Sequence, residues 1–398
     1  MADLLSIEEA LALVLARVRP LAPERVPLRR AAGRILSEDA RSTVDLPPFP
    51  SSAMDGYAVR AADLPATLPV VARVAAGRPA DRPLAAGEAM GIATGGVVPE
   101  GADAVVPIEV VVEHDNNRVE LPPDVAAGEN VRPRGGDIAA GEVVVGSGAR
   151  LSPARLGALA AAGVAEVACA RRPRAAVLAT GTELRAPGEP LGPGEVYEAN
   201  GLILTAQLAS AGAEPERLAP VADDERAHRE AIARGLEADV LVTSGGVSVG
   251  PHDLVRRIEA ELGVEEVFWR VAMKPGKPVS FGLRGETLVF GLPGNPVSSL
   301  VAFELFVRPA LEALQGADDS GPHWRPGRLA REQRQSPDRD QVVRARSRAD
   351  GDALALEPLS GQESHMIGRA AAADALVLVP HGSGTLAAGS AVSFLPLS

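Results

Sequence analysis

The sequence is poor in cysteine, aromatic residues, lysine and long apolar segments, and these shortages exclude several classes of protein. The single cysteine, Cys169, excludes an internal disulfide framework and a cysteine-based zinc site. Its apolar neighbours predict a buried strand residue and not a nucleophile. There is no evident signal peptide and no apolar run that could span a bilayer, so we expect a cytoplasmic protein without a membrane partner. Since aromatic residues make up only 3% of the chain, its cores must be built from Ala, Val and Leu.

The charge balance restricts the partners. A formal net charge of −12 argues against a nucleic-acid partner, so an anionic small-molecule substrate would need a local basic cluster. The only two lysines, Lys274 and Lys277, lie in the segment Met273-Lys274-Pro275-Gly276-Lys277-Pro278. The prolines stiffen this loop, which lowers the entropy cost of holding both ammonium groups ready for one anion. The simpler interpretation is a surface loop with solvated lysines.

The length and the changes of pattern along the chain predict several domains. Ser6 with Glu9 forms a capping box that begins a helix, which we expect to end at Pro20, and Ser152-Pro153 begins another helix. Short Val-rich pieces separated by turns lie between these helices, which indicates an inserted β-rich module. The predicted domains are a helical linker domain (1–40 and 139–172), an inserted β-rich domain (41–138), an α/β domain (173–318) and a C-terminal β domain (319–398).

The second half of the chain alternates between strands and helices from residue 174 onward. This alternation predicts a doubly wound sheet with its binding site at the carboxyl ends of the strands. The basic run 171–174 before it is interpreted as a solvated linker, and residues 316 to about 341 are interpreted as a linker by composition. The expected elements are strands at 175–179, 239–243 and 264–271, a hairpin within 279–290, and helices at 201–211, 254–262 and 297–314.

The most informative segment is residues 243–253, because a buried strand, a Gly-rich turn and a helix follow one another there. Backbone N–H groups and the helix dipole make such a turn an anion site. An ordinary connection between a strand and a helix is the alternative. The candidate ligand-binding residues of this segment are Ser244, Gly245, Gly246 and Ser248, and Asp253 is a candidate metal ligand.

Other loops of the same sheet should lie beside this segment. The segment 291–299 joins a strand to the long helix, and helix capping by Asn295 or Ser298 is the alternative to ligand binding there. The segment 179–183 ends the first strand, and an acidic pair at 223–224 follows a strand-like stretch; a helix N-terminus is the simpler interpretation of these acids. The candidates are Pro293, Asn295, Pro296 and Ser298 in the first loop, Thr180, Gly181 and the candidate metal ligand Glu183 in the second, and Asp223.

The remaining motifs carry little information when each is taken alone. Asp55-Gly56, Thr94-Gly95 and Gly136-Asp137 are typical of turns. The sequence contains no Walker A motif, no zinc-protease motif and no Rossmann glycine pattern. The six histidines show no ligand spacing, and His252 is the only one that we expect near the Gly-rich loop.

Taken together, these segments resemble the molybdopterin molybdenumtransferase family, which includes the E domain of gephyrin. The matching segments occur in the family's order and span nearly the whole chain. They are Pro47-Pro48-Phe49, Ser52-Ala53-Met54-Asp55-Gly56-Tyr57-Ala58, Thr94-Gly95, Pro99-Glu100-Gly101-Ala102-Asp103, Gly136-Asp137-Ile138, Thr180-Gly181, Ser244-Gly245-Gly246-Val247-Ser248-Val249-Gly250 with Asp253, Lys274-Pro275-Gly276-Lys277-Pro278 and Gly291-Leu292-Pro293-Gly294-Asn295-Pro296-Val297-Ser298.

The resemblance implies an elongated four-domain homodimer with a C-terminal β-barrel, whose active site is shared between subunits. It implies insertion of molybdenum from molybdate into adenylylated molybdopterin, with Mg²⁺-dependent release of AMP. The molybdopterin adenylyltransferase is a candidate partner. Matched by position, the catalytic residues are Asp55, Asp137, Asp223, Asp253 and Lys274; the Mg²⁺ ligands are Glu183, Asp223 and Asp253; and Thr94, Arg270 and Lys277 join the substrate-binding residues named above.

The sequence departs from the family pattern at Arg270, where many relatives have lysine. Arginine still binds an oxyanion but does not readily give up a proton. Two alternatives to the transferase remain. One is adenylylation of molybdopterin by ATP, because the α/β domain is shared, and the other is a non-catalytic carrier or scaffold. The motifs Ser52–Tyr57 and Lys274–Pro278 argue against the first alternative, and the presence of Asp55, Asp253 and Lys274 argues against the second.

Overall fold

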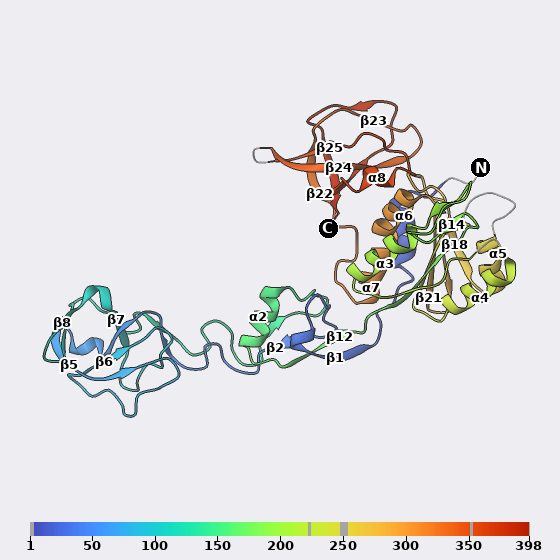
Figure 1. The fold of residues 1–398 in the computed structure, drawn as a ribbon. Coiled ribbons are helices and arrows are strands. Elements are labelled where there is room, and N and C mark those ends of the chain that lie inside the picture. The colour runs from blue at the N-terminus through green and yellow to red at the C-terminus, as the bar shows by residue number, and fades with distance from the viewer. Residues whose placement is uncertain (1–3, 222–223, 247–253, 351–352, 398) are drawn as a thin grey trace.

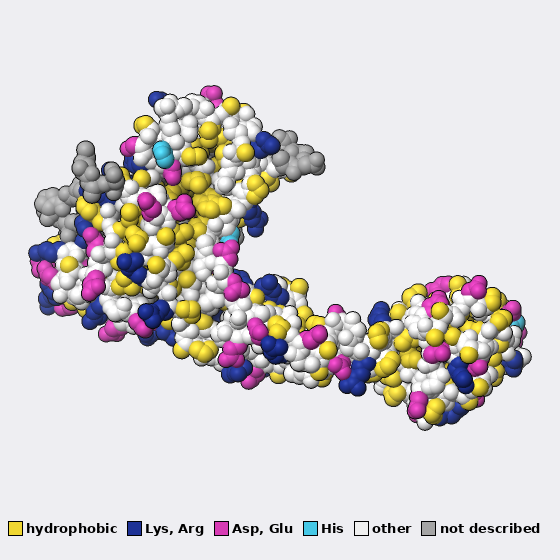
Figure 2. Space-filling model, turned by 180° about the vertical axis from the view of Figure 1, so that it is seen from behind, with side chains coloured by type: hydrophobic (Ala, Val, Ile, Leu, Met, Phe, Trp, Pro, Cys, Tyr) yellow, Lys and Arg dark blue, Asp and Glu magenta, His cyan; other side chains and the backbone are white. Residues whose placement is uncertain are grey.

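The computed structural model describes residues 4–221, 224–246, 254–350 and 353–397. The molecule is elongated (Figure 1), with a β-rich domain at one end, an α/β domain and a C-terminal barrel at the other, and a narrow linker domain between them. The narrow linker domain is also visible from behind in Figure 2. Within the described ranges, none of the helices has both the length and the hydropathy that crossing a bilayer requires.

The α/β domain is built on a six-stranded sheet in the order β16-β13-β17-β21-β20-β18. The first four strands in this order are parallel to one another, and β20 and β18 continue the sheet in antiparallel pairing. The bounds of the strands are β13 Arg174–Ala179, β16 Glu214–Arg217, β17 Val240–Ser244, β18 Glu265–Trp269, β20 Ser280–Arg284 and β21 Thr287–Leu292, with the small parallel pair β14 Leu184–Arg185 and β15 Val196–Tyr197.

Helices cover both faces of this sheet, which confirms the doubly wound arrangement. Alternate residues of each buried strand face opposite sides: Val177 joins one apolar core and Leu178 the other. Helix α3 and the long helix 296–314 pack into the first core, whereas α4 and α5 pack into the second. The bounds of the helices are α3 Asn200–Ser210, α4 Glu225–Gly235, α5 Leu254–Glu261, α6 Pro296–Ala302, the π-helical turn η4 Phe303–Val307 and α7 Arg308–Leu314.

The N-terminal helix α1 (Ile7–Leu15) has the predicted capping box, in which Glu9 N donates to Ser6 Oγ. The helix ends at Leu15, before Pro20. Its buried residues, among them Val14, join the core of the α/β domain. The sequence pattern places this helix with the linker domain, because a local pattern identifies an apolar face but not the surface that the face contacts.

The linker domain holds one helix and two pairs of short antiparallel strands. The helix and the buried strand around Cys169 were predicted from the sequence, and the other three strands were not. Cys169 lies fully buried in its core, as predicted, and burial raises the pKa of the thiol. The elements are β1 Pro23–Pro27 paired with β12 Glu166–Ala170, β2 Ala40–Arg41 paired with β11 Val143–Val145, the 3-10 turn η1 Leu28–Arg30, and α2 Pro153–Ala161.

The β-rich domain contains a six-stranded sheet in the order β7-β4-β6-β5-β9-β8, with apolar cores on both faces. A short antiparallel pair joins β3 with β10. The elements are β3 Ser51–Ser52, β4 Gly56–Val59, β5 Ala66–Val74, β6 Ala89–Ile92, β7 Ala104–Pro107, β8 Val112–His114, β9 Arg118–Leu121, β10 Val131–Arg132, and the 3-10 turns η2 Ala61–Asp63 and η3 Ile108–Val110.

The C-terminal domain is a closed barrel, because β24, β25, β22, β28 and β26 pair in a ring that returns to β24. Part of the segment that was interpreted as a linker is the barrel strand β22. That interpretation was wrong there, since the backbone of β22 pairs with β25 and β28 despite its polar composition. The elements of the barrel domain are β22 Arg325–Leu329, β23 Gln333–Arg334, β24 Asp340–Asp350, β25 Ala353–Pro358, α8 Ile367–Ala370, β26 Ala375–Val379, β27 Thr385–Leu386 and β28 Ala391–Pro396. A short strand of the α/β segment, β19 Met273–Lys274, pairs with the barrel strand β24.

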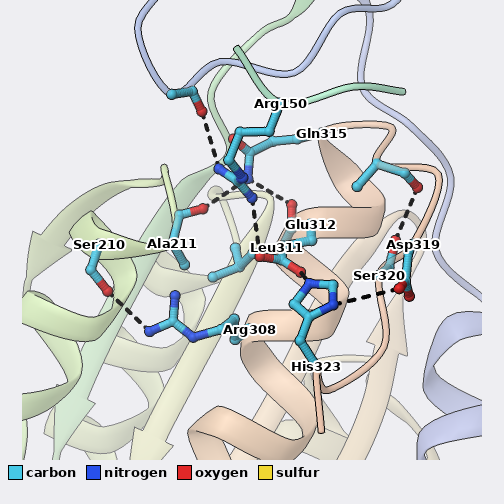
Figure 3. A network of polar contacts seen from close by, with 12 residues as sticks. Arg150, Ser210, Ala211, Arg308, Leu311, Glu312, Gln315, Asp319, Ser320 and His323 are labelled. Atoms are coloured by element: carbon cyan, nitrogen blue, oxygen red, sulfur yellow. Dashed lines mark hydrogen bonds and ion pairs between the residues drawn. The ribbon is translucent and has the colours of Figure 1, made fainter. Parts of the chain in front are cut away.

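A polar network holds the linker domain, α7 and the start of the barrel together (Figure 3). Arg150 Nη2 of the linker domain lies 3.0 Å from Glu312 Oε1 on α7. His323, just before β22, places Nε2 at 3.4 Å from Glu312 Oε2 and Nδ1 at 3.5 Å from Asp319 Oδ2. The Glu312 side chain is 9% exposed, so these contacts compensate the burial of its carboxylate.

The basic run 171–174 is not merely a solvated linker, which corrects the sequence interpretation. Arg171 donates through both terminal nitrogens to the Asp239 carboxylate, at 2.6 and 2.7 Å, and Arg174 N donates to the same carboxylate at 2.8 Å. Burial alone would raise the pKa of Asp239, but the bonds from Arg171 and Arg174 lower it below its usual value. Asp239 directly precedes β17, so this pair fixes the linker to the central sheet.

We predict that Asp239→Asn lowers the stability of the α/β domain by about 1–3 kcal/mol, because it removes a charged partner of Arg171. The pKa of Asp239 is lowered by folding, so its contribution is fully present above the unfolded pKa and is lost as the pH falls through the folded pKa. Urea unfolding at neutral pH and at acidic pH would show the difference from wild type shrinking in acid. The control is Asp81→Asn, on an exposed residue of the β-rich domain. Equal midpoints for both variants at neutral pH would contradict the assignment.

Candidate functional site

A cavity of about 750 Å³ lies where β13, β17 and β21 end. The carboxyl ends of parallel strands meet at one edge of a sheet, so the loops that follow them face one another. The structure brings together nine of the residues that the sequence analysis singled out. They are Thr180, Gly181, Glu183, Ser244, Gly245, Gly246, Pro293, Asn295 and Pro296.

The loop after β17 approaches its neighbours so closely that it requires glycine. Gly245 has a φ of +98°, and a Cβ there would lie 2.7 Å from the Thr180 carbonyl oxygen. Gly246 has a φ of +66°, and a Cβ there would lie 2.5 Å from Val255 Cγ2 on α5. Both φ values are in the region that L side chains rarely adopt. The backbone can therefore come near a ligand only because no side chain stands in the way.

Hydrogen bonds from the C-terminal barrel hold the loop after β21 in place. Asn295 precedes α6, but its side chain makes no capping bond to the helix. Its Nδ2 donates instead to Ser364 Oγ at 2.8 Å, and Val297 N donates to the Ser364 carbonyl at 3.1 Å. Buried Arg344 of β24 donates to the carbonyls of Gly361, Glu363 and Met366 and so fixes this barrel segment. Capping by Asn295, the alternative noted from the sequence, is thus not what its side chain does.

Sequence reasoning did not identify Asn200 as a residue of the site. Asn200, the first residue of α3, lines the cavity, and its side chain contacts both Gly-rich loops. A helix that begins with asparagine gives no signal of such contacts, because asparagine is common at helix starts for capping.

The expectation that only His252 lies near the site was wrong. His228 of α4 and His365 of the barrel both line the cavity. His228 is 1% exposed and its Nδ1 lies 2.9 Å from the Asp224 carbonyl oxygen, which holds the ring against the start of α4. His252 itself lies outside the described residues, together with the predicted site residues Asp223, Ser248 and Asp253.

Among the described residues of the cavity, Glu183 is the carboxylate best placed to bind a metal. The other lining carboxylate, Glu198, is buried and paired with Arg217 and with Gly201 N. Glu183 is exposed, and its carboxylate lies close against Gly181. A Cβ at Gly181 would lie only 2.5 Å from Glu183 Oε2, so a side chain at that position would displace the carboxylate. In the described part of the chain, no three His, Cys, Asp or Glu side chains gather as a metal site. Mg²⁺ commonly takes one or two protein carboxylates together with substrate phosphate oxygens, so this donor set fits it.

The basic loop that follows β18 adjoins the cavity through Pro278, which lines it. The cations themselves do not line it: Lys274 is exposed, and Lys277 and Arg270 are half-buried. The guanidinium carbon of Arg270 lies 3.7 Å from the centre of the Trp269 ring, a cation–π contact that fixes its place. Ser298, the remaining candidate of the α6 loop, is buried and also does not line the cavity.

Three predicted site residues lie in the β-rich domain and not at the cavity. Thr94 N and Thr94 Oγ1 donate to Asp55 Oδ1, at 2.7 and 3.1 Å, so the structure brings Asp55 and Thr94 together. Asp137 is exposed and precedes Ile138, which forms an isolated antiparallel bridge with Leu46. Figure 1 shows the sheet of this domain at the end of the molecule remote from α3 and α6. Within one chain these residues do not complete the cavity.

Comparisons with known proteins cover nearly the whole chain. Residues 5–163 match the model described as MoeA N-terminal region (domain I and II), residues 176–313 match a probable molybdopterin binding domain, and residues 326–397 match the MoeA C-terminal region (domain IV). A molybdopterin molybdenumtransferase 2 from Mycobacterium tuberculosis is 39% identical over 340 residues, which are 82% of each chain. A molybdopterin molybdenumtransferase from Haemophilus influenzae is 40% identical over 300 residues, covering 75% of this chain and 74% of the other.

The fold is similar to that of a solved relative. The crystal structure of a molybdopterin biosynthesis moeA protein from Pyrococcus horikoshii superimposes with a TM-score of 0.85 at 29% identity. The match covers 99% of this chain and 100% of that chain.

Proposed function

The chain belongs to the molybdopterin molybdenumtransferase family, and from this premise we propose that it inserts molybdenum from molybdate into adenylylated molybdopterin and releases AMP. The observation that carries the proposal is the cavity of about 750 Å³ between the loops after β13, β17 and β21. Its volume is that of a small-molecule site, and its Gly-rich backbone suits a phosphorylated ligand. In the reaction water cleaves the phosphoanhydride bond, so that AMP leaves and the terminal phosphate stays on the pterin. The two dithiolene thiols bind the molybdenum of molybdate and displace one of its oxygens, which leaves as water with the two thiol protons, and the oxidation state of molybdenum does not change.

The residues of the cavity have separate tasks in this proposal. The backbone around Gly245 and the start of α6 bind the phosphate part of the substrate. Glu183, with Asp223 and Asp253 outside the described residues, would hold Mg²⁺, which when bound neutralises the charge of the phosphoanhydride. Lys274 and Arg270 bind molybdate beside the pterin. Positioning and charge stabilisation supply most of the rate enhancement, since the reacting groups come from the substrates.

We further propose that the active enzyme is a homodimer whose two sites are shared. The support is the placement of Asp55 and Thr94, which contact one another at the end of the molecule remote from the cavity of their own chain. In a two-fold dimer, the β-rich domain of one subunit faces the α/β domain of the other, and each site takes residues from both.

Removal of Mg²⁺ by a chelator is expected to abolish AMP release, and added Mg²⁺ is expected to restore it. We predict that Glu183→Gln raises the Mg²⁺ concentration for half-maximal rate at least about tenfold, because loss of a ligand weakens metal affinity at least as much as loss of an outer-shell partner. The control is Glu189→Gln, a carboxylate between β14 and β15 that bonds Ala186 N and does not line the cavity. An unchanged Mg²⁺ dependence in Glu183→Gln would remove Glu183 from the metal site.

The alternative functions predict different reactants. An adenylyltransferase would release pyrophosphate from ATP in the presence of molybdopterin, whereas the transferase would not. A carrier would bind adenylylated molybdopterin without releasing AMP. Incubation of the protein with molybdopterin, ATP and Mg²⁺ therefore tests the first alternative directly, and pyrophosphate formation would overturn the proposed function.

A further inference from the structure

The ring of Trp269, the last residue of β18, contacts two guanidinium groups. The guanidinium carbon of Arg270 lies 3.7 Å from the centre of the ring, and that of Arg256 on α5 lies 3.9 Å from it. Both distances are well below the limit of about 6 Å for a cation–π contact, and tryptophan makes the strongest contacts of this kind. The ring therefore holds two cations at the end of β18, where the basic loop begins.

The two cations differ in what else they contact. Arg256 donates through Nε and Nη2 to the Glu266 carboxylate, at 2.8 and 2.9 Å, so its charge is compensated. The Arg270 guanidinium has no carboxylate or hydrogen-bond acceptor among the described residues. A cation–π contact uses the flat face of a guanidinium and not its N–H groups, which lie in the plane. Arg270 is thus held in place while its donors remain available for an acceptor from outside the chain.

The backbone of Arg270 adopts a conformation that costs energy. Its φ is +78°, which is rare for any residue except glycine and a marked outlier for a bulky one. The other non-glycine residues with positive φ in the described ranges are Asn117 and Asn130, and asparagine tolerates this region. Arg270 N donates to the Val279 carbonyl at 2.8 Å, beside Pro278 of the cavity wall. Strain that is retained beside a cavity indicates a function for the side chain that it places.

Main-chain hydrogen bonds also join this segment to the basic loop. Val271 N, the next donor after Arg270, donates to the Lys277 carbonyl at 3.0 Å. Guanidinium and ammonium groups both make charge-assisted hydrogen bonds to oxyanions. An oxyanion that binds at this loop would therefore meet the uncommitted donors of Arg270 together with the loop's lysines.

We propose that Trp269 is a positioning residue for molybdate binding, because its ring holds the Arg270 guanidinium ready and leaves the N–H groups for the oxyanion. This inference rests on the proposed function, in which Arg270 binds molybdate. The contact restricts a long side chain before the anion arrives, so less conformational entropy is lost on binding. A planar guanidinium stacks on an aromatic face better than an ammonium group does. The ring therefore suits arginine at a position where many relatives have lysine.

The test is a double-mutant cycle on molybdate affinity, measured by equilibrium dialysis of the full-length protein with molybdate alone. Arg270→Ala is expected to weaken binding at least about tenfold, because it removes charge-assisted hydrogen bonds. Trp269→Leu is expected to weaken binding about fivefold, the effect of one cation–π contact. Since Trp269 acts through Arg270, the double variant should bind molybdate no more weakly than Arg270→Ala does.

A conservative variant and a matched control separate positioning from packing. Trp269→Phe keeps a smaller aromatic face and should lose about twofold or less. The control is Trp324→Leu, which changes the only other tryptophan, a half-buried residue just before β22, and should bind molybdate like wild type. Thermal unfolding of every variant measures the structural part of the change. If Trp269→Leu does not fold, Trp269→Met, which also lacks an aromatic face, takes its place in the cycle.

The proposal is overturned if Trp269→Leu binds molybdate as tightly as wild type, if its loss adds fully to that of Arg270→Ala, or if Trp324→Leu shows the same loss. A wild-type protein that does not bind molybdate would also overturn it. Binding is measured without adenylylated molybdopterin, so the outcome is separate from that of the proposed function. A protein that binds molybdate through Trp269 and Arg270 but releases no AMP would contradict the transferase and leave this inference standing.

Discussion

Two inactive variants, Asp55→Asn and Lys274→Ala, are expected to recover activity when their subunits are mixed. Asp55 lies in the β-rich domain and Lys274 lies beside the cavity of the α/β domain. These two domains are at opposite ends of the elongated molecule (Figure 1). In a dimer with shared sites, a mixed dimer contains one site in which both residues are native and one in which neither is. Random mixing makes about half of the dimers mixed, so about a quarter of the wild-type activity should return.

The matched control mixes Asp55→Asn with Asp137→Asn. Both residues belong to the β-rich domain, so every site of a mixed dimer carries one of the two changes, and no recovery is expected. The subunits should be separately tagged, so that the mixed dimer is isolated before assay. Since one of its two sites is native, the isolated mixed dimer of Asp55→Asn and Lys274→Ala should show about half of the wild-type activity. A mixed dimer of Asp55→Asn and Lys274→Ala that stays inactive would refute the shared site, whereas a protein that remains monomeric would refute the dimer.

Lys274→Ala is expected to lower the rate of AMP release by about a hundredfold or more, because it removes a fixed positive charge from the place where molybdate is proposed to bind. The chain has only one other lysine, so no nearby ammonium group can replace it except Lys277. Rates measured over a range of molybdate concentrations would show whether the loss is in turnover or in the affinity for molybdate.

The control for Lys274→Ala is Arg284→Ala, which removes an exposed cation at the end of β20 in the same domain. This variant has the same change in net charge and should retain wild-type rates. If both variants lose activity to a similar degree, the loss comes from the changed net charge of the domain and not from a contact of Lys274 with molybdate. If neither does, Lys274 has no part in the reaction.

The sequence predicts the α/β domain well because its signals are local. Alternating residues such as Val177 and Leu178, both buried on opposite faces, require a strand covered on two sides, and the Gly-rich turn after β17 requires a position that no side chain can occupy. The long helix 296–314 and the capping box of α1 follow from helical periodicity and capping chemistry. These features are fixed by residues close to one another in the chain.

What the sequence did not predict depends on distant partners. The place of α1 against the α/β core, the pair between Arg171 and Asp239, and the strand β22 are each decided by residues that are far away along the chain. The same is true of Asn200 and of His365, which reach the cavity from α3 and from the barrel. Local pattern gives the type of an element but not the surface that it meets.

The most direct test of the account is AMP release from adenylylated molybdopterin, measured anaerobically with Mg²⁺, in the presence and absence of molybdate. The account predicts that AMP appears at a rate that depends on molybdate and that molybdenum is recovered bound to the pterin product. Tight binding of the adenylylated substrate with no AMP release at any molybdate concentration would contradict it.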